Sequence, residues 1–532
     1  MAVSRIAQRL GREIELRTVF EHPTVRASPA RRRRPSVRHH RGGPRRPNPP
    51  AAAVLRPGTP LVPGPHLRPG RLYLLWYAWR VRGGLDRTAW QQALDDLVER
   101  HEVLRTALVE SDGRPVQQVC DPVPVPLHWE QAPTAPDAEA RLEAVRRRAA
   151  ALATRRFDLA RPPLLRAGVW ELAADDHVVV VALHHAVTDG WSKGVLLDEL
   201  ALHYRARRAG ERAGLPPLPV QYGDFAVWQR DRADNGALEP QLAYWDGTLE
   251  AAPALELPTD RPRPSVFTGR GGAVEVELPA DLAERVDAYA RERGATRFMV
   301  LLAAAQAVLA RWSGQTDVSV GTPVAGRGRL ELEPLVGFFV NTVVLRTDLS
   351  GRPTFAGLVD RVRDVVLGAF DHQEVPFERV VERLRPERDL SRNPLFQVMV
   401  DVQDASTGGS GLPGLDATGF ELPWPSAKFD LTATFLVRPD RFALNVEYAA
   451  DLFDPETATW FARHVGRLLR AVSPTPEPGW TRRPAYRAGA GYPGGRRGPG
   501  RPVGAAVPGG GLTGRPGRRA RGGALTMPNW TR

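Results

Sequence analysis

The 532-residue chain has very little cysteine and no long apolar run. Cys120 is its single cysteine, so no disulfide can form within the chain, and a reducing compartment is favoured. No stretch of about 18 apolar residues is present, which argues against a membrane span. The N-terminal region also lacks the apolar core of a signal peptide. These absences predict a cytoplasmic protein without a membrane partner.

Lysine is equally scarce, because Lys193 and Lys428 are the only lysines among 73 basic residues. The formal net charge of +13 is unevenly distributed. Residues 1–72 hold 16 Arg against 3 acidic residues, and residues 473–532 hold 11 Arg against 1, whereas the stretch between them is acidic on balance. A GC-rich gene favours arginine, glycine and proline, so the basic flanks are weak evidence for phosphate contacts. We predict no nucleic-acid partner; a basic nucleic-acid binder is the alternative from charge alone.

The most informative stretch is residues 178–192. Residues 178–183 form a continuous apolar run, which predicts a strand buried on both faces. His184 and His185 follow at its end, and a helical pattern begins soon after Asp189 and Gly190. Such a strand holds an imidazole rigidly, and glycine lets a backbone N–H come close to a ligand. We expect Asp189 to fix the loop.

Two simpler interpretations of the histidine pair compete with a catalytic one. Histidines at a strand end are often satisfied polar groups without further function. Two histidines and an aspartate could also bind a metal, but adjacent strand residues point to opposite faces, so a shared ion is disfavoured. We predict no metal. Spacing alone leaves the choice between a structural and a catalytic role open.

The segment His-His-Ala-Val-Thr-Asp-Gly at 184–190 resembles the His-His-x-x-x-Asp-Gly core of condensation domains in nonribosomal peptide synthetases. Five further segments resemble motifs of that family, in the family's order: residues 100–106, 222–228, 336–342, 372–378 and 388–395. The family's opening helix motif is not found at its expected place, near residues 54–64. Trp191, Ser192 and residues 340–342 resemble the LCL subtype, which joins an L-configured donor to an L-configured acceptor.

This resemblance implies an α/β fold of two chloramphenicol-acetyltransferase-like lobes in a V-shaped pseudodimer, with disordered Arg/Pro/Gly-rich flanks. The lobes would span residues 73–256 and 257–472, with the histidine loop at the floor of a tunnel between them. Donor and acceptor carrier domains would dock at opposite mouths, and each would insert a phosphopantetheine arm. The implied reaction is amide formation in nonribosomal peptide biosynthesis. The chain itself would bind no cofactor, and an adenylation module would be its neighbour.

The resemblance also implies roles for individual residues. His185 would act as a general base or position the amine, whereas His184 would face away and be structural. Arg105 would be the ion-pair partner of Asp189, and an N–H near Gly190 would serve the oxyanion. The remaining residues expected to support or line the tunnel are Trp191, Ser192 and Asn341.

The flanks are predicted to lie outside the catalytic fold. Residues 12–25 resemble the tail of a carrier (thiolation) domain, so residues 1–27 are interpreted as its remnant. Residues 28–72 and 473–532 have the composition of disordered segments. Residues 55–65 match the absent helix motif read one base out of frame, which favours a frameshift as the origin of residues 28–72. Two alternatives stay open: an inactive condensation-like fragment, or another carrier- or CoA-dependent acyltransferase of the same superfamily.

Overall fold

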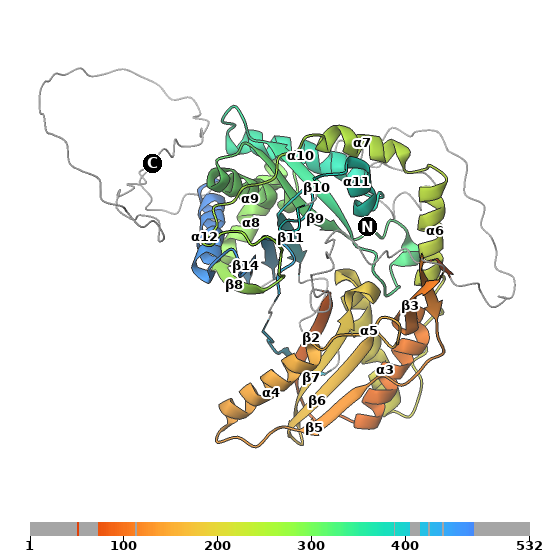
Figure 1. Ribbon diagram of the computed structural model, residues 1–532. Coiled ribbons are helices and arrows are strands. Elements are labelled where there is room, and N and C mark those ends of the chain that lie inside the picture. The colour runs from red at the N-terminus through yellow and green to blue at the C-terminus, as the bar shows by residue number, and fades with distance from the viewer. Residues whose placement is uncertain are drawn as a thin grey trace, which may run out of the picture.

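The computed structural model describes residues 51–52, 73–111, 114–387, 389–404, 415–423, 426–438 and 441–472. Within them the chain forms two α/β lobes (Figure 1). The segment predicted to be a carrier remnant (residues 1–27), the segment predicted to be frameshifted (28–72, apart from residues 51–52) and the predicted C-terminal tail all lie outside the described residues, as does Arg388 of the 388–395 motif.

The first lobe contains a five-stranded sheet covered on both faces. Its strands, in spatial order, are β12 (Asp416–Gly419), β2 (Leu74–Arg82), β7 (Asp176–His184), β6 (Leu165–Ala173) and β5 (Leu127–Gln131). Its helices are α3 (Arg87–Arg100), α4 (Ala138–Ala153) and α5 (Gly190–Arg208). A smaller sheet pairs β1 (Ala51–Ala52), β4 (Arg114–Val119) and β3 (Thr106–Ser111), next to the short helix η1 (Glu102–Arg105).

The central strand β7 is apolar because both of its faces are buried. Val178 and Val180 pack in the cluster formed with α4, whereas Val179 and Val181 pack in the cluster formed with α3 and α5. This alternation is the ordinary consequence of side chains pointing to opposite faces of a strand. The predicted doubly buried strand is therefore confirmed, and it ends at His184, the first of the two histidines.

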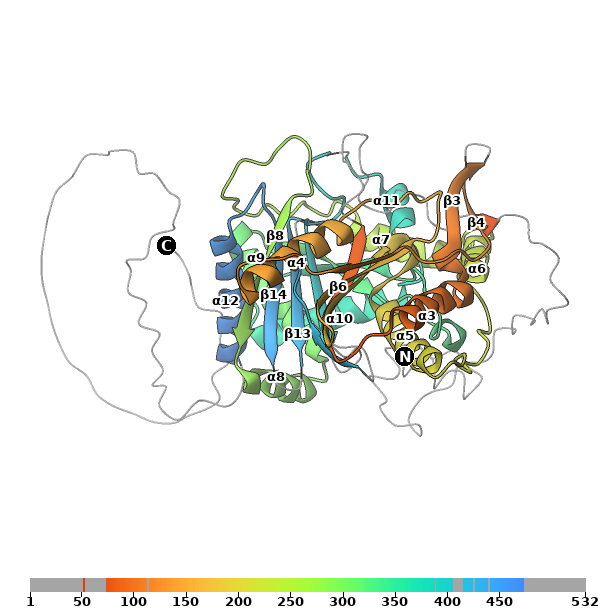
Figure 2. The same cartoon turned by 90° about the horizontal axis from the view of Figure 1, so that it is seen from below.

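The second lobe contains a six-stranded sheet. Its strands, in spatial order, are β10 (Asn341–Asp348), β9 (Asp317–Val324), β11 (Val398–Asp404), β13 (Leu431–Val437), β14 (Phe442–Ala449) and β8 (Gly271–Leu278). Its helices are α8 (Ala280–Glu292), α9 (Arg297–Ser313), α10 (Phe355–Asp371) and α12 (Pro455–Val472), with α7 (Glu239–Leu249) and α11 (Phe377–Leu384) packed on each other. Figure 2 shows α12 and α8 far from α3 and α5 of the first lobe.

The apolar helix predicted at 298–312 is α9, the most buried helix of the second core. Thr296 caps its start, and Gly314 ends it in the left-handed conformation at φ 72°. Among the described residues no single helix is long and apolar enough to cross a membrane. The pair α8 and α9 would pass such a test together by length and composition, with a bend of 102° between them.

The lobes exchange chain segments, so their boundary differs from the predicted break at 256/257. Leu242 and Trp245 of α7 already pack in the second core, and so do Leu255 and Leu257 on either side of that break. The prolines of this segment predict a linker, but its flanking leucines are buried. In the other direction, β12 pairs with β2 of the first lobe, although it follows most of the second lobe in the chain.

A second exchange places residues 332–339 in the core of the first lobe. Leu335, Val336 and Phe339 belong to the cluster that contains residues of α3, α5 and α6 (Tyr222–Asp234). The short helix η3 (Leu330–Leu332) begins this excursion. The segment thus leaves β9, crosses to the first lobe and returns to β10, passing the end of β7 where the histidines lie.

Candidate functional site

His185 is held at the junction of β7 and α5. It begins the short helix η2 (His185–Val187), directly after the last residue of β7. Its backbone N–H donates to the carbonyl of Tyr73 at 2.7 Å, which extends the pairing of β7 with β2 by one bond. The position of this imidazole is therefore fixed by a buried strand and not by a flexible loop.

The imidazole of His185 has a defined proton position. Its Nδ1 lies 2.7 Å from the carbonyl oxygen of Thr188. A carbonyl oxygen can only accept, so Nδ1 carries the proton and the neutral ring keeps a lone pair on Nε2. No hydrogen bond to this Nε2 is found in the described part of the chain. Burial, followed by the charge of Lys428, lowers the pKa of His185 to about 3, so the ring is neutral near pH 7.

His184 carries its proton on the other ring nitrogen. Its Nδ1 accepts the backbone N–H of Ala186 at 3.1 Å, so the neutral ring carries its proton on Nε2. The rings of Tyr73 and Phe157 lie with their centroids 6.4 Å from it. Burial, followed by the charge of Lys428, lowers its pKa to about 4. In these tautomers only His185 offers a free basic nitrogen.

Asp189 fixes the loop by accepting hydrogen bonds from both lobes. It is the N-cap of α5, and its Oδ1 accepts the backbone N–H of Ser192 at 2.8 Å and the Ser192 hydroxyl at 2.7 Å. Its Oδ2 accepts the backbone N–H of Phe339, from the segment that crosses between the lobes, at 2.9 Å. The residue is 1% exposed, so all of these bonds are made away from bulk water.

The predicted pairing of Arg105 with Asp189 is wrong. In η1, Nη1 of Arg105 donates to the carbonyl of Cys120 at 2.5 Å, and its Nη2 lies 3.7 Å from Glu102. The ion-pair partner of Asp189 is Arg327, whose Nη2 lies 3.3 Å from Oδ1. The reason is orientation: Asp189 caps α5 with its side chain toward the crossing segment, whereas Arg105 is held against β4.

Arg327 is a buried residue beside Asp189 that the sequence motifs did not single out. It is 3% exposed, and its guanidinium lies 3.9 Å from the ring centroid of Phe339. Nη1 donates to the carbonyls of Leu332 and Leu335, and Nη2 also donates to the Ser192 hydroxyl at 2.9 Å. Burial lowers the pKa of Arg327, and the charge of Asp189 opposes that shift. The guanidinium therefore ties the crossing segment to the start of α5.

Gly326 explains why the chain can turn so tightly beside Arg327. Its φ is +64°, and a Cβ at this position would lie 1.9 Å from the carbonyl oxygen of Phe339. Only glycine fits such a contact and such a backbone conformation. A glycine followed by an arginine just after a buried strand is the local signal at this position, but it does not by itself identify the partner of Asp189.

Three other predicted residues also hold the site together. The indole N–H of Trp191 donates to the carbonyl of Glu333 at 3.0 Å, and the Ser192 hydroxyl lies 2.9 Å from the carbonyl of Gly337. The amide of Asn341 donates to the carbonyls of residues 373 and 375 and accepts the N–H of residue 377. These bonds tie α5, the crossing segment and the 372–378 motif together. Contact of these side chains with a substrate stays a prediction.

Gly190 leaves open space at the start of α5. It is exposed, and a Cβ built on it would meet no atom within 4 Å. The first N–H groups of a helix have no partner within the helix and carry partial positive charge. The open space at Gly190 is compatible with the predicted approach of an oxyanion to the N–H groups at the start of α5.

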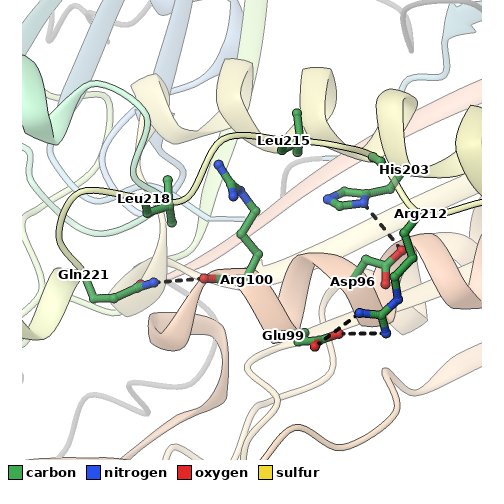
Figure 3. Close-up of a pocket in the computed structure, with 9 residues that line it drawn as sticks. Asp96, Glu99, Arg100, His203, Arg212, Leu215, Leu218 and Gln221 are labelled. Carbon is green, nitrogen blue, oxygen red and sulfur yellow. Dashed lines mark hydrogen bonds and ion pairs between the residues drawn. The ribbon is translucent and has the colours of Figure 1, made fainter. Parts of the chain in front are cut away.

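A separate cavity of about 260 Å³ lies between α3 and α5, lined by charged side chains (Figure 3). Glu99 pairs there with Arg212, and His203 lies 3.5 Å from Asp96. None of the predicted site residues line it. No group of three or more His, Cys, Asp or Glu side chains that could hold a metal ion is found among the residues that the structure describes.

Comparison with protein families places this geometry in a known context. The model of the condensation domain matches residues 69–481. The chain belongs to the condensation-domain family. One of the linear gramicidin synthase proteins of Brevibacillus parabrevis is 42% identical over 502 residues, which cover 89% of this chain and 6% of that protein. Phosphinothricin tripeptide synthetase PhsC of Streptomyces viridochromogenes is 41% identical over 419 residues, or 78% of this chain and 38% of the relative.

Solved structures confirm the predicted fold. The X-domain from teicoplanin biosynthesis superposes with a TM-score of 0.70 at 32% identity, covering 76% of this condensation-family chain and 91% of the X-domain. The first condensation domain of the calcium-dependent antibiotic synthetase superposes with a TM-score of 0.62 at 22% identity, a likeness of fold alone. Both the predicted family and the predicted two-lobed α/β architecture are thus confirmed. The chain spans only a small part of the peptide synthetases that it matches.

Proposed function

We propose that this condensation domain catalyses amide formation between two carrier-bound substrates, an acyl thioester donor and an amino acid acceptor. The observation that carries the proposal is the neutral His185, with its proton fixed on Nδ1 and no hydrogen bond to Nε2 in the described chain. A positioned base of this kind contributes roughly 10²–10⁴-fold in rate. The buried pair of Asp189 and Arg327 supports it by joining both lobes behind the histidine loop.

In the proposed reaction the acceptor amine attacks the carbonyl carbon of the donor thioester. The new C–N bond forms while the π pair of the carbonyl moves to its oxygen, and Nε2 of His185 takes a proton from the amine. When the oxyanion collapses, the C–S bond breaks and the leaving thiolate takes the proton from His185. The N–H groups near Gly190 would hydrogen-bond to the oxyanion, an interaction that is strongest in the transition state.

The substrates and partners follow from the family context. Donor and acceptor carriers would present phosphopantetheine-linked thioesters, and this chain would carry no prosthetic group of its own. Relatives that are much longer than this chain support a neighbouring adenylation module and further carriers. Trp191 and Ser192 favour the LCL subtype. We infer a cytoplasmic location, where such carriers are loaded.

The proposal is tested by giving the full chain a donor carrier loaded with an acyl thioester and an acceptor carrier loaded with an amino acid. Mass spectrometry should show the donor acyl group on the acceptor carrier, as an amide. The matched control is an acceptor whose amine is fully N-methylated. This quaternary nitrogen has no lone pair to attack the thioester, so the acceptor should stay unmodified. Transfer to free CoA instead of the amine would favour a different acyltransferase, and no transfer from a folded chain would favour an inactive fragment.

A further inference from the structure

Each of the two lysines of this arginine-rich chain lies over the ring of a tyrosine. Only Lys193 and Lys428 occur among 73 basic residues, so most positions that need only a positive charge hold arginine. Nζ of Lys428 lies 5.7 Å from the ring centroid of Tyr73, and Nζ of Lys193 lies 5.3 Å from that of Tyr77. Tyr77 lies in β2, and Tyr73 is the residue just before that strand. One lysine thus lies beside the strand that pairs with β7, and the other beside its start.

Lys428 comes from the second lobe but lies beside the histidines of the first. Its side chain contacts the ring of Tyr73, whose carbonyl accepts the N–H of His185 at 2.7 Å and whose ring centroid is 6.4 Å from that of His184. Its main chain is fixed, because the amide of Asn393 donates to the Lys428 carbonyl at 2.9 Å. Lys428 is the charge that acts most strongly on both imidazoles.

Lys428 is half-buried. Burial lowers its pKa, because desolvation disfavours the charged ammonium. The charge of Glu447 opposes part of this shift. Within the described ranges, no carboxylate lies within 4.0 Å of Nζ and no hydrogen bond donated by Nζ is found. Among the described residues the three N–H donors of Nζ face the ring of Tyr73 and no hydrogen-bond acceptor, so they are suited to an anion that exists only briefly.

We propose that Lys428 is a further catalytic residue, whose ammonium donates to the oxyanion of the tetrahedral intermediate formed beside His185. This inference rests on the proposed amide-forming function. The ammonium takes up no proton and loses none in the step; it stabilises the negative charge while the C–N bond is present and the C–S bond is unbroken. A single oxygen atom offers no bidentate geometry, so the compact lysine point charge suits it better than the planar guanidinium. The same charge lowers the pKa of His185 and so favours the later transfer of its proton to the leaving thiolate.

The test compares Lys428→Met with Lys193→Met in the full chain. Single-turnover product formation should fall about 10²–10³-fold in Lys428→Met, as expected on loss of one oxyanion donor. Lys193→Met is the matched control, since it removes the other lysine, whose charge is not among those that act on His185, and it should stay within about threefold of the wild type. The rate of product formation by Lys428→Arg should lie between those of Lys428→Met and Lys193→Met. A Lys428→Met rate within about threefold of the wild type would overturn the proposal.

A second readout separates this proposal from the amide-forming function. In ¹⁵N-histidine spectra, Lys428→Met should raise the pKa of His185, because a repulsive charge has been removed, whereas Lys193→Met should leave it unchanged. An unchanged His185 pKa in Lys428→Met rejects the proposal, even if the wild type makes no product. Thermal melts check that the fold is kept, and Lys428→Gln, which keeps a polar group at this position, replaces Lys428→Met if that variant does not fold.

Discussion

Asp189→Ala is expected to lower the free energy of unfolding by about 3–5 kcal/mol, the usual cost of removing one partner from a buried ion pair. The substitution leaves the guanidinium of Arg327, which is 3% exposed, without its carboxylate. It also removes the acceptor of the Phe339 N–H and the N-cap of α5, and loss of a cap alone costs about 1 kcal/mol. Domains are typically stable by about 5–15 kcal/mol, so a large fraction of the stability would be lost.

Chemical denaturation of the full chain measures this effect. Asp189→Asn should lower the free energy of unfolding by less, because its remaining side-chain oxygen can still accept the hydrogen bonds from Ser192. Arg327→Met should be about as costly as Asp189→Ala, and the double variant should be less costly than the sum of the two. Arg105→Met is the matched control, because Arg105 makes no bond to Asp189, and it should lower the free energy of unfolding clearly less than Asp189→Ala does. An unchanged free energy of unfolding for Asp189→Ala would contradict the buried pair.

His185→Ala is expected to reduce single-turnover amide formation by roughly 10²–10⁴-fold, the contribution of a positioned base. The fold should survive, because the backbone bond from His185 to Tyr73 does not need the side chain. The side-chain bond to Thr188 and the edge contact with Phe338, at a centroid distance of 5.0 Å, would be lost. Mass spectrometry of the acceptor carrier measures the product, and a thermal melt measures the fold.

His184→Ala is the matched comparison. His184 packs near Tyr73 and Phe157 and accepts the Ala186 N–H, so its loss should reduce stability more than turnover. Abolished product in a well-folded His184→Ala variant, together with near-normal turnover in His185→Ala, would mean that the roles of the two histidines are reversed.

Much of the architecture could be predicted because local pattern and burial agree. The run at 178–183 is apolar on both faces, and the structure buries it between α4 on one side and α3 and α5 on the other. Helix α9 is equally clear, since nearly every residue of it is apolar and its ends carry Thr296 and Gly314. The motif order then identifies the family, which the match over residues 69–481 confirms.

The partner of Asp189 could not be predicted from local pattern. Arg327 lies 138 residues further along the chain, and it is one of many arginines. Nothing in its immediate sequence shows that residues 332–339 cross into the first lobe and become buried there. The exchange of β12 is unpredictable for the same reason, because strand pairing between distant segments depends on the tertiary fold.

The boundary between the lobes illustrates a different failure. Prolines near residue 257 suggest a linker, but prolines also occur in packed irregular chain. Leu255 and Leu257 are buried in the second core, and α7 before them already belongs to it. Burial of apolar side chains, and not proline content, decides to which lobe a segment belongs.

The central claim is that a neutral His185, protonated on Nδ1, presents a free Nε2 to the reacting amine. ¹⁵N-histidine spectra of the full chain test it most directly, with His185→Gln identifying the His185 signals among those of 12 histidines. Because the pKa is lowered to about 3, the account predicts a neutral ring with its proton on Nδ1 both near neutrality and after mild acidification. A proton on Nε2, or an imidazolium that forms near the ordinary histidine pKa of 6.5, would contradict it.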